Sequence, residues 1–189
     1  MKELKIGCVI MAAGLSARFG RNKLLAEYEG RSLICRALDA VPAEKLYKTA
    51  VVTCYPEVKA LALARNFECV WNGAPEKGAA LTIRLGLNTL LDADAVLFMV
   101  SDQAALKRES VSALIDYYCN NSGCIVRMAY RGQGGNPCIF PSAFFPELLD
   151  LQGDTGGRGI IKRHEGLTLN YDISDPAELT DADYPADLP

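Results

Sequence analysis

The sequence predicts an α/β fold in which a mainly parallel sheet is covered by helices on both faces. Short, nearly continuous apolar runs rich in Val, Ile and Cys indicate buried strands. Helical patterns, several of them opening with Ser, Pro or Arg-Glu-Ser, separate these runs almost throughout the chain. This alternation is typical of right-handed strand–helix–strand units. Strands are expected at 5–11, 49–54, 67–71, 94–100, 124–130, 137–140 and 167–171, and helices near 31–41, 56–66, 79–91, 108–120, 142–151 and 157–164.

Length and composition limit the number of domains and the kinds of partner. The 189 residues, half of them hydrophobic, predict one compact domain over residues 1–189, with a terminal helix and tail at about 173–189. The formal net charge of -3 gives no general attraction to nucleic acid, so no nucleic-acid partner is expected. No membrane association is expected either, because no apolar run approaches the roughly 20 residues that span a bilayer.

Cysteine and histidine usage restricts the location and the chemistry. Seven cysteines are scattered through apolar runs without a CxxC pair, a pattern typical of reduced, buried thiols, which predicts a cytoplasmic protein. His164 is the single histidine, so histidine metal cages and Ser-His-Asp catalysis have almost nothing to draw on.

A glycine-containing loop, "AAGLSARFGRNK", follows the first predicted strand. Small residues allow backbone N–H groups to approach an anion, while Arg18 and Lys23 bring positive charge, so the loop is suited to a phosphate chain. The spacing matches neither a Walker A loop nor the GxGxxG dinucleotide fingerprint. The alternative is an ordinary turn with solvated basic side chains.

Two aspartates follow predicted strands and are expected at the sheet edge where the glycine loop lies. Asp102 comes directly after the strand in "DAVLFMVSDQ", and Asp172 ends the last strand in "LTLNYD". Two carboxylates together with phosphate oxygens suit Mg²⁺. The alternatives are a helix N-cap for Asp102 and an ordinary turn before proline for Asp172.

These segments resemble the MobA-like nucleotidyltransferase family, and within it the molybdenum cofactor cytidylyltransferases. "VIMAAGLSARFGRNKLL" is similar to the AAGxSxRxGxxK signature, "GAPEKGAALTIRLGLN" to GMSSSLRAGL, "SDQA" to GDQP, and "LQGDTGGRGII" to GDxGAR. The matches occur in the family's order from Ile6 to about Leu179. The resemblance implies a Rossmann-like, three-layer α/β/α nucleotidyltransferase fold with a mainly parallel, mixed sheet.

The resemblance also assigns site residues. Arg18, Lys23 and Asp102 are the expected catalytic residues. Asp102 and Asp172 are the expected Mg²⁺ ligands. The expected nucleotide-binding residues are Ala12, Ala13, Gly14, Ser16, Arg18, Lys23, Gly78 and Thr82. The expected acceptor-binding residues are Asn136, Asp154, Gly157 and Arg158, and the open alternative for Asp154 is a cap on the following helix.

The activity that the resemblance implies is Mg²⁺-dependent transfer of a nucleoside monophosphate from a triphosphate, with release of pyrophosphate. CTP is the expected donor, molybdopterin or molybdenum cofactor the expected acceptor, and a molybdoenzyme client a further suggested partner. Ala80, Leu81, Asn136 and Ser174 depart from the family pattern. They leave open GTP as donor, a sugar-phosphate-type acceptor, or a cofactor-binding or insertion accessory protein without transfer activity. A nicotinamide-dependent oxidoreductase fits the fold class but lacks the dinucleotide fingerprint.

Overall fold

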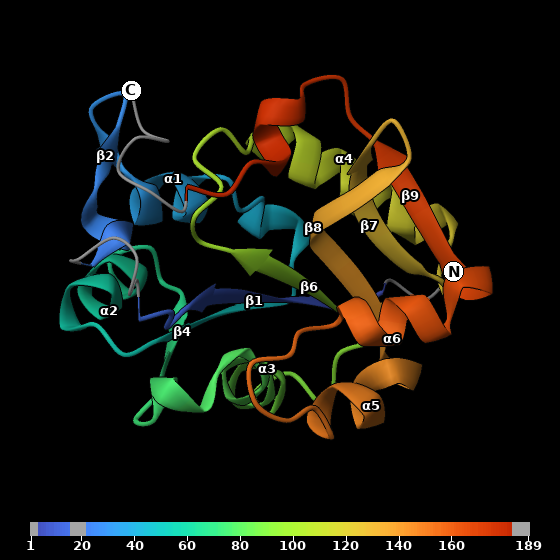
Figure 1. The fold of residues 1–189 in the computed structure, drawn as a ribbon, viewed down its shortest axis with the longest axis horizontal. Helices are drawn as coiled ribbons and strands as arrows, with labels where there is room; N and C mark the ends of the chain where they lie inside the picture. Colours follow the sequence, from blue (N-terminus) through green and yellow to red (C-terminus); the bar gives the residue numbers. More distant parts are fainter. Residues whose placement is uncertain (1–3, 16–21, 183–189) are drawn as a thin grey trace.

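The computed structural model describes residues 4–15 and 22–182, and its central feature is one seven-stranded sheet (Figure 1). The strand order is β5-β4-β1-β6-β8-β7-β9. Only β8 runs antiparallel to its two neighbours, β6 and β7, so the sheet is mainly parallel but mixed, as predicted. The strands are β1 (Ile6–Ala12), β4 (Lys48–Thr53), β5 (Glu68–Trp71), β6 (Ala95–Val100), β7 (Ile125–Tyr130), β8 (Gln133–Pro141) and β9 (Thr168–Asp172).

Helices cover both faces of this sheet and produce three layers. In Figure 1, α3, α5 and α6 lie below the sheet, while α1 and α4 lie above it. Buried residues of α1, α2 and α4 join one apolar core, and those of α3, α5 and α6 join the other. The helices are α1 (Leu33–Asp39), α2 (Pro56–Leu63), α3 (Ala79–Leu87), α4 (Arg108–Asn120), α5 (Phe145–Leu149) and α6 (Arg158–Arg163).

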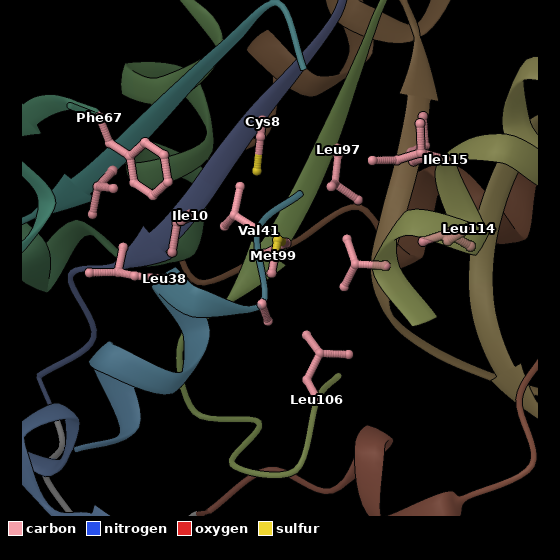
Figure 2. Close-up of a cluster of buried hydrophobic side chains, with 14 of the residues drawn as sticks. Cys8, Ile10, Leu38, Val41, Phe67, Leu97, Met99, Leu106, Leu114 and Ile115 are labelled. Atoms are coloured by element: carbon pink, nitrogen blue, oxygen red, sulfur yellow. The ribbon is translucent and has the colours of Figure 1, made fainter. Parts of the chain in front are cut away.

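The alternation of side chains along each strand builds the two cores. Cys8, Ile10, Leu97 and Met99 point into the core shown in Figure 2, where Leu38 of α1 and Leu114 and Ile115 of α4 meet them. The intervening residues Val9, Val96 and Phe98 contribute to the opposite core. Because both faces of the central strands are buried, those strands appear in the sequence as nearly continuous apolar runs.

Short 3₁₀ turns and a small hairpin connect the main elements. The hairpin joins β2 (Glu27–Tyr28) to β3 (Arg31–Ser32), and the Ser32 hydroxyl then caps α1 by accepting a hydrogen bond from the Cys35 N–H. The turns are η1 (Lys23–Leu25), η2 (Ala43–Lys45), η3 (Pro75–Lys77), η4 (Ser142–Phe144), η5 (Glu165–Leu167) and η6 (Pro176–Leu179). In the part of the chain that the structure describes, no helix is long and apolar enough to cross a membrane.

Candidate active site

The carboxyl ends of β1, β4 and β6 meet at one edge of the sheet, because these three strands are parallel neighbours. At this edge the loop after β1 is anchored on the last residue of β4 and on the segment that follows it. The Thr53 hydroxyl donates to the Ala12 carbonyl at 2.9 Å, and the Tyr55 hydroxyl donates to the Gly14 carbonyl at 2.8 Å. The carbonyl oxygens of Ala12 and Gly14 are therefore occupied by these hydroxyl groups. The loop would contact an anion through its backbone N–H groups.

Lys23 lies at the start of η1, directly after the glycine loop, and reaches across to β6. Its Nζ donates to Asp102 Oδ2 at 2.7 Å and to the Ala182 carbonyl at 3.2 Å. Both side chains of the ion pair are largely shielded from solvent, with 15% of Lys23 and 20% of Asp102 exposed. The structure thus brings together the two predicted catalytic residues that it describes. Arg18 and Ser16 lie outside the described residues.

Asp102 lies in an irregular segment that leads from β6 to α4. The Ser101 hydroxyl donates to the Met11 carbonyl at 2.8 Å and so joins the end of β6 to β1. Asp102 is not a helix N-cap, since α4 begins six residues later at Arg108 and the residue before it, Lys107, occupies the cap position. The Asp102 carboxylate therefore lies at the sheet edge and does not cap α4.

Asp172 lies at the same edge of the sheet but far from Asp102. Strands β8 and β7 separate β9 from β6, and three strand spacings correspond to about 14 Å. The Asp172 carboxylate accepts a hydrogen bond from the Gly132 N–H at 2.8 Å, in the turn between β7 and β8. The structure does not bring the two expected Mg²⁺ ligands together, and Asp172 instead holds the turn between β7 and β8, a long-range contact that differs from the local turn considered as its alternative.

The segment before α3 and the segment before α6 are joined. Asp154 Oδ1 accepts from the Ala79 N–H at 3.1 Å, and the Gly153 carbonyl accepts from the Ala80 N–H at 3.1 Å. Asp154 therefore caps α3 and not α6, which corrects the capping alternative considered for it. The expected nucleotide side and the expected acceptor side of the site are connected through these two hydrogen bonds.

The close packing of these two segments requires a glycine at position 78. Its φ of +82° is unfavourable for other residues, and a Cβ atom there would lie 2.6 Å from the Asp154 backbone. Thr82, the other expected nucleotide residue on this side, is only 5% exposed, and its hydroxyl accepts a hydrogen bond from the Asn72 amide at 3.2 Å. Both residues thus have structural roles that the sequence did not reveal.

The remaining expected acceptor residues lie on β8 and at the start of α6. Asn136 is half-buried, and its carbonyl accepts from Gln103 Nε2 at 3.3 Å, which links β8 to the Asp102 segment. Gly157 packs against the Phe140 ring, which a Cβ atom would approach to 2.6 Å. Arg158 is exposed at the first position of α6. Among the four acceptor residues, only Asn136 is linked directly to the Asp102 segment by a hydrogen bond among the described contacts.

Sequence reasoning missed several residues that hold the site together. Arg36 of α1 donates from Nε to the Ala104 carbonyl at 2.5 Å and from Nη1 to the Tyr28 carbonyl at 3.4 Å. It therefore connects the segment after Asp102 to the hairpin after Lys23. The signal for Thr53 and Tyr55 was present, because they lie at the carboxyl end of a predicted strand, at the same sheet edge as the glycine loop. Arg36 lies inside a helix and carried no such signal.

The described side chains at the site could provide only part of the coordination of a metal ion. In residues 4–15 and 22–182, no group of three or more His, Cys, Asp or Glu side chains could hold a metal ion. Among the predicted ligands, Asp102 is the carboxylate that lies beside Lys23 at this edge, while Asp172 lies three strands away. Mg²⁺ commonly takes one or two protein carboxylates and completes its coordination with phosphate oxygens and water. The residues present therefore fit a metal that is bound jointly by protein and nucleotide.

Comparison with known proteins identifies the family and supports the fold described above. The family model of the MobA-like NTP transferase domain matches residues 8–167. The purine catabolism protein PucB of Bacillus subtilis is 25% identical in an alignment of 198 positions that spans 94% of this chain and 91% of PucB. A nucleotidyl transferase from Methanothermobacter, Mth528, superposes with a TM-score of 0.81 at 20% identity, over 97% of this chain and 94% of that one.

A second solved structure, Rv0371c from Mycobacterium tuberculosis, has a TM-score of 0.80 at 25% identity. The match covers 99% of this chain and 96% of Rv0371c. The fold, the order of the motifs and the family match agree over nearly the whole chain. The chain belongs to the MobA-like NTP transferase domain family and is a nucleotidyltransferase.

Proposed function

We propose that this nucleotidyltransferase moves the nucleoside monophosphate of CTP to a phosphate-bearing acceptor of the molybdopterin type, with Mg²⁺ as its metal. The observation that carries the proposal is the Lys23–Asp102 pair at the carboxyl ends of β1 and β6. A cation for phosphate and a carboxylate for metal lie side by side at the sheet edge where α/β proteins bind ligands. Transfer between phosphates needs little more from a protein than positioning and charge stabilisation.

The chemistry follows from the groups present. An oxygen of the acceptor phosphate attacks the α-phosphorus, and the bond from that phosphorus to the β-phosphate oxygen breaks, so that pyrophosphate leaves. The acceptor phosphate is ionised at neutral pH and needs no side-chain base. Lys23 is placed to stabilise the negative charge of the departing pyrophosphate, and Asp102 would hold the metal. When bound, the metal would supply further charge neutralisation on the phosphates.

Related proteins support the finer parts of the proposal. Rv0371c has been solved as a complex with manganese, at 22% identity and a TM-score of 0.69. A molybdopterin-guanine dinucleotide biosynthesis protein from Archaeoglobus fulgidus has the same fold, with a TM-score of 0.68 at 16% identity. These relatives favour a divalent metal and a molybdopterin acceptor, and the sequence resemblance to cytidylyltransferases favours CTP.

Thermal unfolding with single nucleotides tests the proposal. The protein is heated with CTP, GTP, ATP or UTP, each with and without Mg²⁺, beside the variants Lys23→Ala and Lys45→Ala. Lys45 forms an ion pair with Asp116 at 2.6 Å on another part of the surface and is the matched control. A ligand at about 100 times its Kd stabilises the protein by about 2.7 kcal/mol, which raises Tm by several degrees.

We expect CTP to raise Tm in the presence of Mg²⁺. This increase in Tm should be lost in Lys23→Ala and kept in Lys45→Ala. A rise with GTP alone would replace CTP by GTP as the donor. No rise with any nucleotide would overturn the proposal and favour a molybdenum cofactor accessory protein without transfer. Pyrophosphate release with any acceptor would exclude that accessory role.

A further inference from the structure

The Lys23 ammonium group forms an ion pair with Asp102, the carboxylate that would hold the metal in the proposed reaction. Nζ of Lys23 is 2.7 Å from Asp102 Oδ2, and the pair is mostly shielded from solvent. A divalent cation bound to the same carboxylate would lie within a few ångströms of this ammonium group. Two positive charges at that distance repel strongly where water is largely excluded. Lysine and metal therefore compete for Asp102.

The C-terminal segment holds Lys23 in this position. The Ala182 carbonyl accepts from Lys23 Nζ at 3.2 Å, while the Ala182 N–H donates to the Asp102 carbonyl at 2.9 Å. The Ala182 side chain is 3% exposed and packs with Leu33 and Ala104. Ala182 thus contacts both members of the ion pair and favours the arrangement in which they touch.

The same segment is fixed along the residues that follow Asp102. The buried Glu178 carboxylate accepts from the Lys107 N–H at 3.0 Å, and Lys107 Nζ donates to Asp175 Oδ2 at 2.8 Å. Figure 1 shows the red chain that follows η6 running toward α1. Lys23, Asp102 and Ala182 are therefore connected by hydrogen bonds, and the contacts of Lys107 with Asp175 and Glu178 fix the C-terminal segment beside them.

A polyphosphate changes the balance at Asp102. Its oxygens give the Lys23 ammonium group a second set of anionic acceptors, and they also supply metal ligands beyond the Asp102 carboxylate. From this geometry we propose that Lys23 acts as a built-in competitor of the divalent cation, so that metal alone binds weakly and metal and nucleotide bind cooperatively. The proposal deepens the proposed function and rests on Asp102 as the metal ligand.

Binding of Mn²⁺ in the absence of nucleotide tests the proposal without any turnover. Electron paramagnetic resonance gives the affinity of free Mn²⁺ for the wild type, Lys23→Met, Lys45→Met and Asp102→Asn. Methionine keeps the length and apolar stem of lysine and removes its charge. Removing the competitor is expected to tighten Mn²⁺ binding about tenfold in Lys23→Met, within the usual range of coupling between ligands. Lys45→Met is expected to match the wild type, and Asp102→Asn to lose the site.

A labelling experiment on the wild-type protein tests the same competition from the side of the lysine. An amine-reactive reagent is applied with and without saturating Mn²⁺, and the labelled lysines are identified by mass spectrometry. Mn²⁺ is expected to raise the labelling of Lys23 several-fold by releasing it from Asp102, and to leave Lys45 unchanged. This measurement needs no variant and stands even if Lys23→Met folds poorly.

The outcomes separate this proposal from the proposed function. If Asp102→Asn loses Mn²⁺ binding while Lys23→Met binds no tighter than the wild type, and Mn²⁺ leaves Lys23 labelling unchanged, the competition is refuted although the metal site stands. If Mn²⁺ binds equally well to Asp102→Asn, the metal lies elsewhere and the competition is again refuted. In both cases, pyrophosphate release by the wild type decides separately whether the protein transfers nucleotides.

Discussion

Single residues at the site are positioned by contacts with elements that are distant in the sequence. Lys23 and Asp102 are 79 positions apart in the sequence and meet because β1 and β6 are parallel neighbours. Gly78 and Asp154 are likewise distant in sequence and meet where the start of α3 is capped. Each of these contacts involves backbone of another element: Lys23 donates to the Ala182 carbonyl, and Asp154 accepts from the Ala79 N–H. Gly78 is constrained twice, by its positive φ and by its close approach to the Asp154 backbone.

Replacing Gly78 by alanine is expected to destabilise the protein more than a positive φ alone explains. The new Cβ atom would add a clash with the Asp154 backbone to the cost of the unusual conformation. We expect the free energy of unfolding to fall by about 2 kcal/mol or more. Urea denaturation measures this change.

Gly153→Ala is the matched control. Gly153 has a φ of +62°, but a Cβ atom there would meet nothing within 4 Å. Its cost is expected to be about 1 kcal/mol, that of the left-handed conformation alone. Equal losses in the two variants would show that the close approach of Gly78 to Asp154 contributes nothing.

At the scale of elements, the segment after β6 takes its shape from its neighbours, because few of its residues form regular structure. Arg36 of α1 holds its Ala104 carbonyl, Gln103 connects it to β8, and Glu178 of η6 holds the Lys107 N–H. These contacts come from three different elements. The position of Asp102 therefore depends on α1, β8 and the C-terminal segment together.

Arg36→Lys tests the contribution of α1. A lysine keeps the charge but lacks the planar fork that reaches the Ala104 and Tyr28 carbonyls from one group. Since small displacements of catalytic groups are costly, kcat/KM for nucleotidyl transfer is expected to fall about tenfold. Arg163→Lys, which changes an arginine paired with Glu147, is the control and is expected to keep full activity. Unchanged kcat/KM in Arg36→Lys would remove α1 from this role.

Asp175→Asn tests the attachment of the C-terminal segment through its pH dependence. The hydrogen bond from Lys107 holds the pKa of the Asp175 carboxyl below its usual value of 3.8. Because the folded pKa is the lower one, the stabilisation is present above about pH 3.8 and is lost as the pH falls through the folded value. The Tm difference between wild type and variant is expected at pH 7 and should disappear in strong acid. A difference that does not change with pH would contradict this.

At the scale of the whole molecule, the sequence predicted the layers well and the long-range contacts poorly. All seven predicted strands and six predicted helices are confirmed, since buried strands and amphipathic helices leave their periodicity in the sequence. The β2–β3 hairpin was not predicted, because strands of two residues carry no such pattern. The expected terminal helix is the 3₁₀ turn η6 within the residues that the structure describes.

Strand order explains the main differences at the site. Both aspartates were correctly expected at one sheet edge, but a sequence does not show that β8 and β7 lie between β6 and β9. The same limitation hid the role of Ala182, whose contacts with Lys23 and Asp102 are made by its backbone. Backbone contacts of this kind depend on the path of the chain and leave no trace in residue type.

We expect Asp102 and Lys23 to serve nucleotidyl transfer directly. The most direct measurement follows CTP labelled on its α-phosphate, incubated with molybdopterin and Mg²⁺ and the wild type, Asp102→Asn or Asp116→Asn. We expect the wild type and Asp116→Asn to transfer the label to the acceptor and to release unlabelled pyrophosphate, whereas Asp102→Asn keeps its fold but loses turnover. Full transfer by Asp102→Asn would remove Asp102 from the reaction.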